Sequence, residues 1–407
     1  MRLQHFIPIS GGKDSAGTAC LAVERFHRKG SGNLPPRFVH CDVGKNEHQA
    51  TVEHVAYLDE WLRAELGVGI EIIRADFTEK LAQRRANIRD DWSQEKTLIR
   101  HSGECKATTE GMGWTARRDH RRACSCIRII LPPVEPELIE KAIGLLQPTG
   151  DPFLDLCMLK GRFPGAKSRF CTEELKLEPM GIVKRAVWAE GISTVEWIGE
   201  RADESPARAG KPVLQRVRMP GSTACQIIYR PVHAMTAADM FALAERHGLK
   251  PNPLYLMGAK RVGCWPCVLC GKDELINIAN RTPDHIDRLR EWELLVSEVS
   301  RRQMATFFPS SDVQGAEGDP SLARIDERIR WARTGHGGRQ LDLMRTAEIF
   351  EPTATGCSAI PPMGSANEQG RQERQPLSWP ARAARSSHRR RRLEMGWQAL
   401  SRAANPL

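Results

Sequence analysis

Three cysteines stand at intervals of three in the segment "KRVGCWPCVLCGKDEL", residues 260–275. Cys264, Cys267 and Cys270 give the spacing C-x₂-C-x₂-C, which lets consecutive thiolates converge on one centre and is typical of the start of an iron–sulfur ligand run. Zinc usually takes two pairs of ligands, or one pair with histidines. Either group needs a fourth thiolate from elsewhere in the chain. The alternative is that these thiols are reduced and only pack.

A glycine-rich segment, "ISGGKDS" at residues 9–15, joins a predicted strand to a predicted helix. Backbone N–H groups of such a turn, together with the positive end of a helix dipole, can surround a phosphate. It is not a Walker A loop, because an aspartate follows the Gly-Lys pair and residue 7 is isoleucine. An ordinary turn is the alternative, but six consecutive compatible residues favour an anion site. These residues are Ser10, Gly11, Gly12, Lys13, Asp14 and Ser15.

Cations and carboxylates suited to holding phosphates occur further along the chain. Lys176, Arg201 and Arg208 accompany an acidic pair, Asp203–Glu204. The cations suit phosphate groups, and a carboxylate there could hold either Mg²⁺ or an arginine. Each residue alone is equally compatible with a surface salt bridge. Asp42 ends the second predicted strand, at the edge of the sheet where open α/β folds bind ligands.

Alternating strand and helix patterns position these residues. Segments 5–10, 37–44 and 70–76 are predicted strands, with helices at 14–30 and 47–67 between them. This order predicts a doubly wound, mostly parallel α/β sheet of Rossmann-like type. Further helices are predicted at 181–191, 236–248 and 282–303, the last capped by Thr282 and Pro283, and a strand with its loop at 192–204.

The predicted organisation has four parts. A nucleotide-binding domain is built from residues 1–83 and 151–300 and is interrupted by an irregular Arg- and Cys-rich insertion at 84–150. A helical extension follows at 301–352. Residues 353–407 are rich in Pro, Ser, Gly and Arg without a period, which predicts a disordered basic tail.

Composition limits the classes of protein that fit. No apolar run is long enough to span a membrane, and the start of the chain is too polar for a signal peptide, so we expect a cytoplasmic protein with no membrane partner. In that compartment the 12 cysteines should be reduced, which favours metal ligation or catalysis over disulfides. The tail carries nine Arg and three Glu, hence +6 of the formal charge of +10. A nucleic acid could bind this tail, and a solvated charge run is the alternative.

Several motifs together resemble one known family. The loop "SGGKDS" resembles that of the PP-loop (adenine nucleotide alpha hydrolase-like) enzymes. The stretches "RFCTEELKLEP", "WIGERADESPAR" and "YRPVHAMTAADMFALAERHGLKPNPLYLMGAKRVGCWPC" resemble the phosphoadenosine phosphosulfate (PAPS) reductase family within that superfamily. The resemblance covers roughly residues 3–295 without the insertion. It implies binding of ATP with Mg²⁺, or of PAPS, with Lys13, Asp14, Lys176, Arg201 and Glu204 as catalytic residues.

The resemblance also bears on the cysteines. In cluster-bearing sulfonucleotide reductases, ligands lie in the Cys…Lys…Pro segment and in a later Cys-x-x-Cys, which correspond to Cys171 and to Cys264 with Cys267. Thr172 here replaces an adjacent cysteine, and Cys270 could supply the missing ligand. We therefore expect a [4Fe–4S] cluster on these four thiolates, with zinc as the alternative.

The resemblance favours an activating enzyme over a reductase. Reductases need a nucleophilic cysteine in a Glu-Cys-Gly-Leu-like motif near their C-terminus, whereas Cys357 stands in "ATGCSAI". We therefore expect an enzyme that cleaves ATP between the α and β phosphates for sulfur transfer or nucleic-acid modification, similar to iron–sulfur ATPases of the DNA-phosphorothioation protein C type. A sulfur donor or a reductant protein would be a partner. A PAPS reductase, or a non-catalytic nucleotide- or nucleic-acid-binding module, is the alternative.

Overall fold

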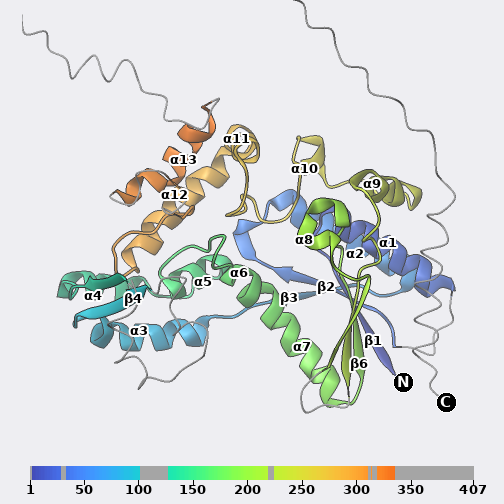
Figure 1. The fold of residues 1–407 in the computed structure, drawn as a ribbon, viewed down its shortest axis with the longest axis horizontal. Coiled ribbons are helices and arrows are strands. Elements are labelled where there is room, and N and C mark those ends of the chain that lie inside the picture. Colours follow the sequence, from blue (N-terminus) through green and yellow to red (C-terminus); the bar gives the residue numbers. More distant parts are fainter. Residues whose placement is uncertain are drawn as a thin grey trace, which may run out of the picture. The chain divides into compact units, whose positions relative to one another are not determined.

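A six-stranded sheet in the order β3-β2-β1-β6-β8-β7 forms the centre of one part of the fold (Figure 1). The computed structural model describes residues 2–28, 34–100, 127–218, 224–309, 313 and 319–334. Neighbouring strands are parallel except for the β7–β8 pair. The predicted doubly wound, mostly parallel α/β fold is confirmed. The strands are β1 (Leu3–Pro8), β2 (Arg37–Asp42), β3 (Ile70–Arg74), β6 (Ser193–Trp197), β7 (Leu214–Arg218) and β8 (Cys225–Tyr229).

Helices cover both faces of this sheet, because successive side chains of a strand point to opposite faces. Ile7 of β1 packs into a core with residues of α1, α2 and α9. Its neighbour Phe6 packs on the other side against Met180 and Val187 of α7. These four helices are α1 (Lys13–Arg28), α2 (Gln49–Leu66), α7 (Glu178–Ala189) and α9 (Ala237–Arg246).

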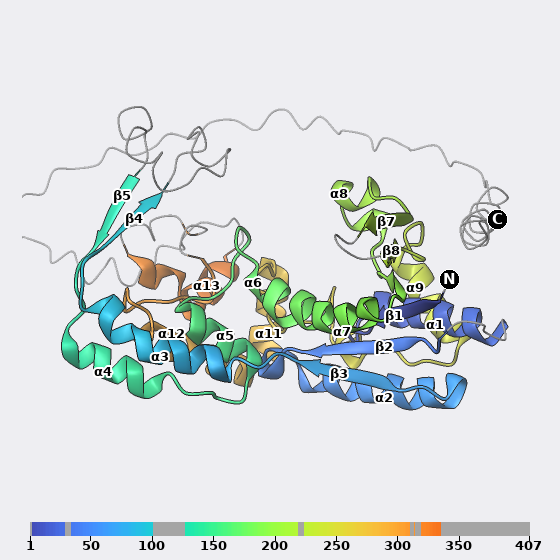
Figure 2. The same ribbon diagram turned by 90° about the horizontal axis from the view of Figure 1, so that it is seen from below.

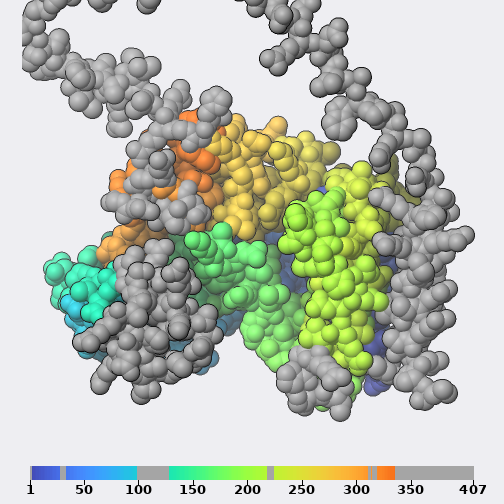
Figure 3. Space-filling model, in the orientation of Figure 1, coloured from blue at the N-terminus to red at the C-terminus, as the bar shows by residue number. Residues whose placement is uncertain are grey.

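A separate core lies among six helices drawn from residues 78–160 and 272–332 (Figure 2). In the space-filling view, the teal segment of α4 lies beside the light-orange segment of α12 (Figure 3). We call this part the helical lobe; the sequence patterns predicted its helix at 282–303 but not that these helices share a core. Its elements are α3 (Thr78–Trp92), α4 (Pro136–Leu145), α5 (Pro152–Lys160), α11 (Lys272–Arg281), α12 (Pro283–Glu298) and α13 (Ile325–Ala332), with the hairpin β4 (Lys96–Arg100) and β5 (Ile127–Leu131).

The predicted insertion at 84–150 is regular where the structure describes it. Residue 84 lies inside α3, and the hairpin and α4 follow, so these parts belong to the helical lobe and its hairpin. Residues 101–126 lie outside the described residues. Of the predicted extension at 301–352, the described part contains a 3₁₀ turn at Pro320–Ala323 and α13. The predicted tail at 353–407 lies outside the description.

The start of α12 agrees only in part with the helix start predicted from the sequence. Pro283 begins α12 as predicted, but the Thr282 side chain does not cap it. Its hydroxyl instead donates to the Ile278 carbonyl oxygen at 3.0 Å and accepts the indole N–H of Trp265 at 3.0 Å. Thr282 therefore occupies the predicted N-cap position, but its hydroxyl is committed to the preceding helix and to a buried tryptophan.

Within the described residues, no helix has the length and apolar character needed to cross a bilayer.

Glu293 is a buried carboxyl group that should make the stability of the helical lobe depend on pH. It is 2% exposed and accepts the backbone N–H groups of Phe307 at 2.7 Å and Ile325 at 3.1 Å. Burial raises its pKa from 4.5 to about 7. Between these values the unfolded chain loses its proton while the folded chain keeps it. We expect the free energy of unfolding to fall by about 3 kcal/mol as the pH rises through this window.

Urea unfolding at several pH values measures this slope. Glu293→Gln stays neutral, so we expect the fall in stability through this window to disappear in that variant. Glu298→Gln, at a half-exposed carboxylate in the last turn of the same helix, is the matched control and should keep the wild-type slope. Equal slopes in wild type and Glu293→Gln would show that this carboxyl group does not control the effect.

Candidate functional site

The glycine loop lies between the carboxyl end of β1 and the start of α1, as predicted. The buried Ser15 hydroxyl donates to the Gly12 carbonyl oxygen at 2.9 Å and accepts the Ser10 backbone N–H at 3.1 Å. These bonds close the loop on itself. Gly11 has a φ of 68°, and a β-carbon there would lie 2.7 Å from a side-chain carbon of Thr51. Glycine is therefore required at this position both for its backbone conformation and for space.

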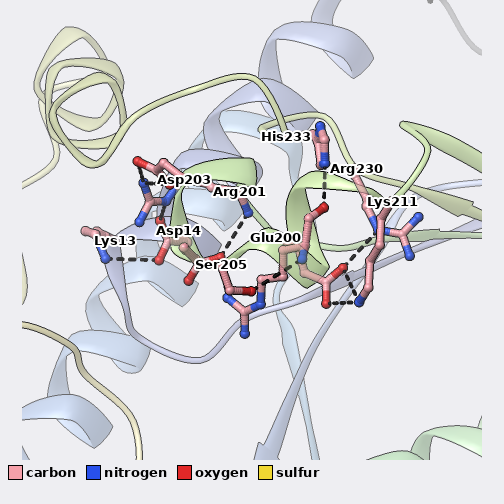
Figure 4. Close-up of polar contacts among 11 residues, drawn as sticks. Lys13, Asp14, Glu200, Arg201, Asp203, Ser205, Lys211, Arg230 and His233 are labelled. Atoms are coloured by element: carbon pink, nitrogen blue, oxygen red, sulfur yellow. Dashed lines mark hydrogen bonds and ion pairs between the residues drawn. The ribbon is translucent and has the colours of Figure 1, made fainter.

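An ion-pair network joins the loop to the segment after β6 (Figure 4). Asp14 Oδ2 lies 3.1 Å from Lys13 Nζ, and its Oδ1 lies 2.7 Å from Arg201 Nε. Arg201 is 5% exposed and also donates to Asp203 at 2.6 Å. Burial opposes the charge of Arg201, but Asp14 and Asp203 outweigh it and raise its pKa. The structure thus brings together residues 187 positions apart in sequence.

The acidic pair after Arg201 is engaged by arginines. Asp203 binds Arg201, while Glu204 accepts the Arg201 backbone N–H at 2.9 Å and pairs with Arg208. Burial opposes ionisation of Glu204, but these hydrogen bonds lower its pKa overall. The Arg208 carbonyl oxygen lies 2.9 Å from a ring nitrogen of His233. We expected these carboxylates to hold either Mg²⁺ or an arginine, and in the described structure each of them pairs with an arginine.

A second carboxylate that is shared by a lysine and an arginine lies beside this network. Glu200 is shared by Lys211 at 2.7 Å and Arg230 at 2.9 Å, as Asp14 is shared by Lys13 and Arg201 (Figure 4). Lys211 and Arg230 together lower the pKa of Glu200 against the effect of its burial. This Lys–carboxylate–Arg group stands outside the glycine loop, which makes it a natural internal control.

Two residues that hold the loop were not assigned a role from sequence. The Asn252 amide donates to the Gly11 carbonyl oxygen at 3.1 Å and to the Thr51 hydroxyl at 3.3 Å, and its side-chain oxygen caps the short helix α10 (Pro253–Leu256). The Tyr255 hydroxyl accepts the Lys13 backbone N–H at 2.9 Å. Burial raises the pKa of Tyr255 to about 12. Their only sequence signal was the Asn-Pro-Leu-Tyr turn.

We expect Asn252→Ala to lower the free energy of unfolding by about 2–4 kcal/mol, since it removes a helix cap and leaves a buried carbonyl oxygen without its donor. Asn252 is 1% exposed. Urea denaturation measures the change, and nucleotide affinity should weaken with it. Asn87→Ala, on the exposed face of α3, is the control and should change stability by less than about 0.5 kcal/mol. A similarly small effect at Asn252 would mean that it does not hold the loop.

The cysteine segment lies against the glycine loop. A β-carbon on Gly12 would come within 3.4 Å of the Val262 carbonyl oxygen, two residues before Cys264. Cys264 forms an isolated β-bridge with Glu47, and the buried Trp265 donates its backbone N–H to the Asn46 carbonyl oxygen at 2.8 Å. The tryptophan between the first two cysteines therefore anchors the segment in the core.

The four predicted metal ligands are free, half-buried thiols at the edge of the helical lobe core. Burial raises the pKa of Cys171, and its electrostatic interactions with Cys264 and Cys267 raise it further. Burial likewise raises the pKa of Cys270, and Glu274 and Cys267 raise it further. No three His, Cys, Asp or Glu side chains of the described residues gather as ligands of a single ion.

Lys176 lies beside these cysteines. Cys171 is on α6 (Phe170–Thr172), and a π-helical turn at Glu173–Leu177 carries Lys176 before α7 begins. The interaction with Cys264 is the largest cause of the raised pKa of Lys176. π-helical turns are frequent at functional sites. No hydrogen bond or ion pair places the Lys176 ammonium with Lys13 and Arg201 among the described residues, so it belongs to the cysteine side.

Asp42 is at the carboxyl end of β2, as predicted, but it is engaged locally. Its side chain accepts the Gly44 backbone N–H at 2.7 Å and lies 3.5 Å from Arg74. Within the described structure this carboxylate shapes the turn after β2, where Gly44 has a φ of 73°.

Comparison with known proteins decides the family. Residues 165–270 match the model of the phosphoadenosine phosphosulfate reductase domain. An uncharacterized 37.8 kDa protein of Escherichia phage 186 is 38% identical over 364 residues, which are 88% of this chain and 95% of the phage protein. An adenosine 5′-phosphosulfate reductase of Chelativorans is 34% identical over 116 residues, 27% of this chain and 42% of that enzyme. The chain carries a domain of the PAPS reductase family.

The family match contains every predicted site residue from Cys171 to Cys270 but not the glycine loop. A solved structure of PAPS reductase from Candida auris, in complex with phosphate, is similar at 13% identity with a TM-score of 0.30. It covers 64% of this chain and 81% of that one.

Proposed function

We propose that this PAPS reductase-family protein is an enzyme that binds ATP, or a related adenosine nucleotide, at the glycine loop. It cleaves the bond between the α and β phosphates and places AMP on an acceptor, for sulfur transfer or nucleic-acid modification. The observation that carries the proposal is the network in which Lys13 and Arg201 share Asp14 at the carboxyl end of β1. This is the edge of an open α/β sheet where ligands bind.

The chemistry follows from the groups present. An acceptor nucleophile attacks the α-phosphorus, the bond to the bridging oxygen breaks, and pyrophosphate leaves with the electron pair. Lys13 and the loop N–H groups stabilise charge on the leaving phosphates. Arg201 is buried and fixes Asp14, and through it Lys13, so we assign it a positioning role.

The network has too little net positive charge to bind a nucleotide polyanion alone, which is why we propose that Mg²⁺ accompanies the nucleotide. Lys13, Arg201 and Arg208 are balanced by Asp14, Asp203 and Glu204. Three cations against three carboxylates give little net attraction for a polyanion. The loop N–H groups, the start of α1 and Mg²⁺ brought with the nucleotide would supply it.

The cysteines suit a thiolate-bound group. Zinc would hold its four sulfur atoms about 2.3 Å from one ion. A [4Fe–4S] cluster places each thiolate on a different iron, so its ligands are more widely spaced. We propose that Cys171, Cys264, Cys267 and Cys270 hold such a cluster, with zinc as the alternative. When bound, it would supply a rigid, negatively charged link beside Lys176 or an electron-transfer centre.

A sulfonucleotide reductase is the second candidate, favoured by the similarity to an adenosine 5′-phosphosulfate reductase. That reaction needs a cysteine nucleophile at the sulfonyl sulfur. Cys357, the cysteine of the predicted tail, lacks the expected flanking residues and lies outside the described residues.

One set of assays separates these functions. The protein is incubated with Mg²⁺ and ATP, and pyrophosphate and AMP are measured with and without nucleic acid. A parallel reaction contains PAPS or adenosine phosphosulfate with thioredoxin, and sulfite is measured. Pyrophosphate release supports the proposal, sulfite release supports the reductase, and tight binding without turnover supports a non-catalytic module.

A further inference from the structure

A basic cavity of about 740 Å³ lies in the helical lobe, away from the residues of the glycine loop. Its walls come from α3, the hairpin β4–β5, the end of α5 and the segment after α12 (Figure 2). One carboxylate, Asp91, faces six basic side chains. These are Arg84, Lys96, Lys160, Arg162, Arg301 and Arg302.

Two of the arginines are half-buried in the wall, and their guanidinium groups are held mainly by neutral acceptors. Arg84 donates to the carbonyl oxygens of Leu159 and Val299, the latter at 2.8 Å. Arg301, whose side chain is 9% exposed, donates to the Asp91 and Gln94 carbonyl oxygens and lies 3.9 Å from the Asp91 carboxylate. The buried Nε of each arginine lacks an acceptor among the described residues.

These contacts explain the position of both arginines, since they satisfy the carbonyl-bearing ends of helices. Carbonyl groups leave a full positive charge on each arginine, however, and burial lowers the pKa of Arg84 because that charge is costly there. The wall therefore presents two poorly compensated charges to the cavity.

The remaining cations are more accessible. Arg302 is exposed, and the described residues form no ion pair with it. Arg162 is exposed and donates to the Ser168 hydroxyl at 3.1 Å. Lys96 pairs with Asp91 at 2.6 Å, and Lys160 pairs with Glu174 at 2.5 Å. Glu174 lies in the π-helical turn that also carries Lys176, so this edge of the cavity approaches the cysteine side of the nucleotide site.

We propose that this cavity binds the phosphodiester backbone of a single-stranded nucleic acid. Six cations from four segments exceed what a single phosphate needs, and they suit a chain of phosphates. Half-buried Leu98, Leu131 and Met304 offer apolar contact to sugars or bases. The volume is that of a site for a small ligand, so it can take a nucleotide or two of a strand but not a duplex. The proposal uses none of the residues proposed to bind ATP.

Fluorescence anisotropy with a labelled oligonucleotide of about 20 residues tests the proposal on the full chain. Lys96→Glu with Arg302→Glu should weaken single-strand binding at least about tenfold. It should also reduce the slope of log K against log salt by about 1.4, since each lost phosphate contact contributes about 0.7. Circular dichroism melting confirms that the double variant folds.

A matched variant controls for net charge. Arg185→Glu with Lys250→Glu also reverses one paired and one exposed cation, on α7 and after α9, and should change affinity by less than about twofold. The predicted basic tail is present in both variants and cannot account for a difference. Equal losses in the two variants, tighter binding of duplex than of single strand, or equally strong competition by thymidine monophosphate would each overturn the proposal. Pyrophosphate release without nucleic acid should be unchanged in both variants, so failure here and failure of the ATP reaction are distinguishable.

Discussion

Lys13→Ala is expected to reduce pyrophosphate release from ATP by about 100- to 1,000-fold, the cost of removing one group that stabilises the charge of a transition state. The Lys13 ammonium lies 3.1 Å from Asp14, with its side chain 10% exposed. After the substitution Asp14 still pairs with Arg201 at 2.7 Å. The loop is closed by Ser15 and Tyr255 through bonds that do not use the lysine side chain. The fold should therefore survive, and isothermal titration should show weaker ATP binding.

The chain supplies a matched control for this experiment. Lys211→Ala also removes a lysine from a carboxylate that keeps an arginine partner, Glu200 with Arg230. It should change pyrophosphate release by no more than a small factor, because surface ion pairs contribute little. If Lys13→Ala kept activity near that of Lys211→Ala, the glycine segment would be only a turn and the proposed reaction would fail. A combined Lys13→Ala and Ser15→Ala variant extends the test to the loop backbone.

The sheet could be predicted because its strands and helices alternate locally. Segment 37–44 was expected to be a strand and contains β2, and segment 47–67 contains α2. The helical lobe could not be predicted in the same way. Every residue of α5 from Pro152 to Met158 is buried, so the helix lacks the polar face that gives a readable period. Its partners α3 and α12 are distant in sequence, and only the tertiary contact reveals their common core.

The residues of the candidate site also divide into those that the sequence alone could predict and those that only the fold brings together. The glycine loop was readable because its residues are consecutive, and its backbone chemistry depends on their types. Asn252 escaped assignment because its two bonds to Gly11 and Thr51 span more than 200 positions. The basic cavity could not be predicted from the sequence for another reason. Its cations are dispersed along a chain in which basic residues are common, and the clustering of Arg84 with Arg301 exists only in three dimensions.

Anaerobically purified protein is expected to be brown and to contain about four irons per chain if the four thiolates hold a [4Fe–4S] cluster. Cys171→Ser or Cys264→Ser should each remove most of this iron, because each takes away one of four ligands from a different part of the chain. Metal analysis and visible absorption measure the effect without depending on activity. The metal-free protein should also unfold at lower urea concentration, since ligand binding is coupled to folding.

Cys41→Ser is the matched control for the cysteine variants. Cys41 is half-buried like the proposed ligands, and its sulfur lies 3.8 Å from the Lys176 carbonyl oxygen, a contact that a serine hydroxyl can replace. This variant should keep its full iron content. One zinc per chain in colourless protein, lost on Cys264→Ser, would establish the zinc alternative. Metal-free protein with full activity would show that Cys171, Cys264, Cys267 and Cys270 only pack, as their places against the helical lobe core also permit. Because Val262 lies against Gly12, loss of the cluster should also weaken nucleotide binding. Unchanged nucleotide affinity in the cluster-free protein would show that the cysteine segment and the glycine loop act independently.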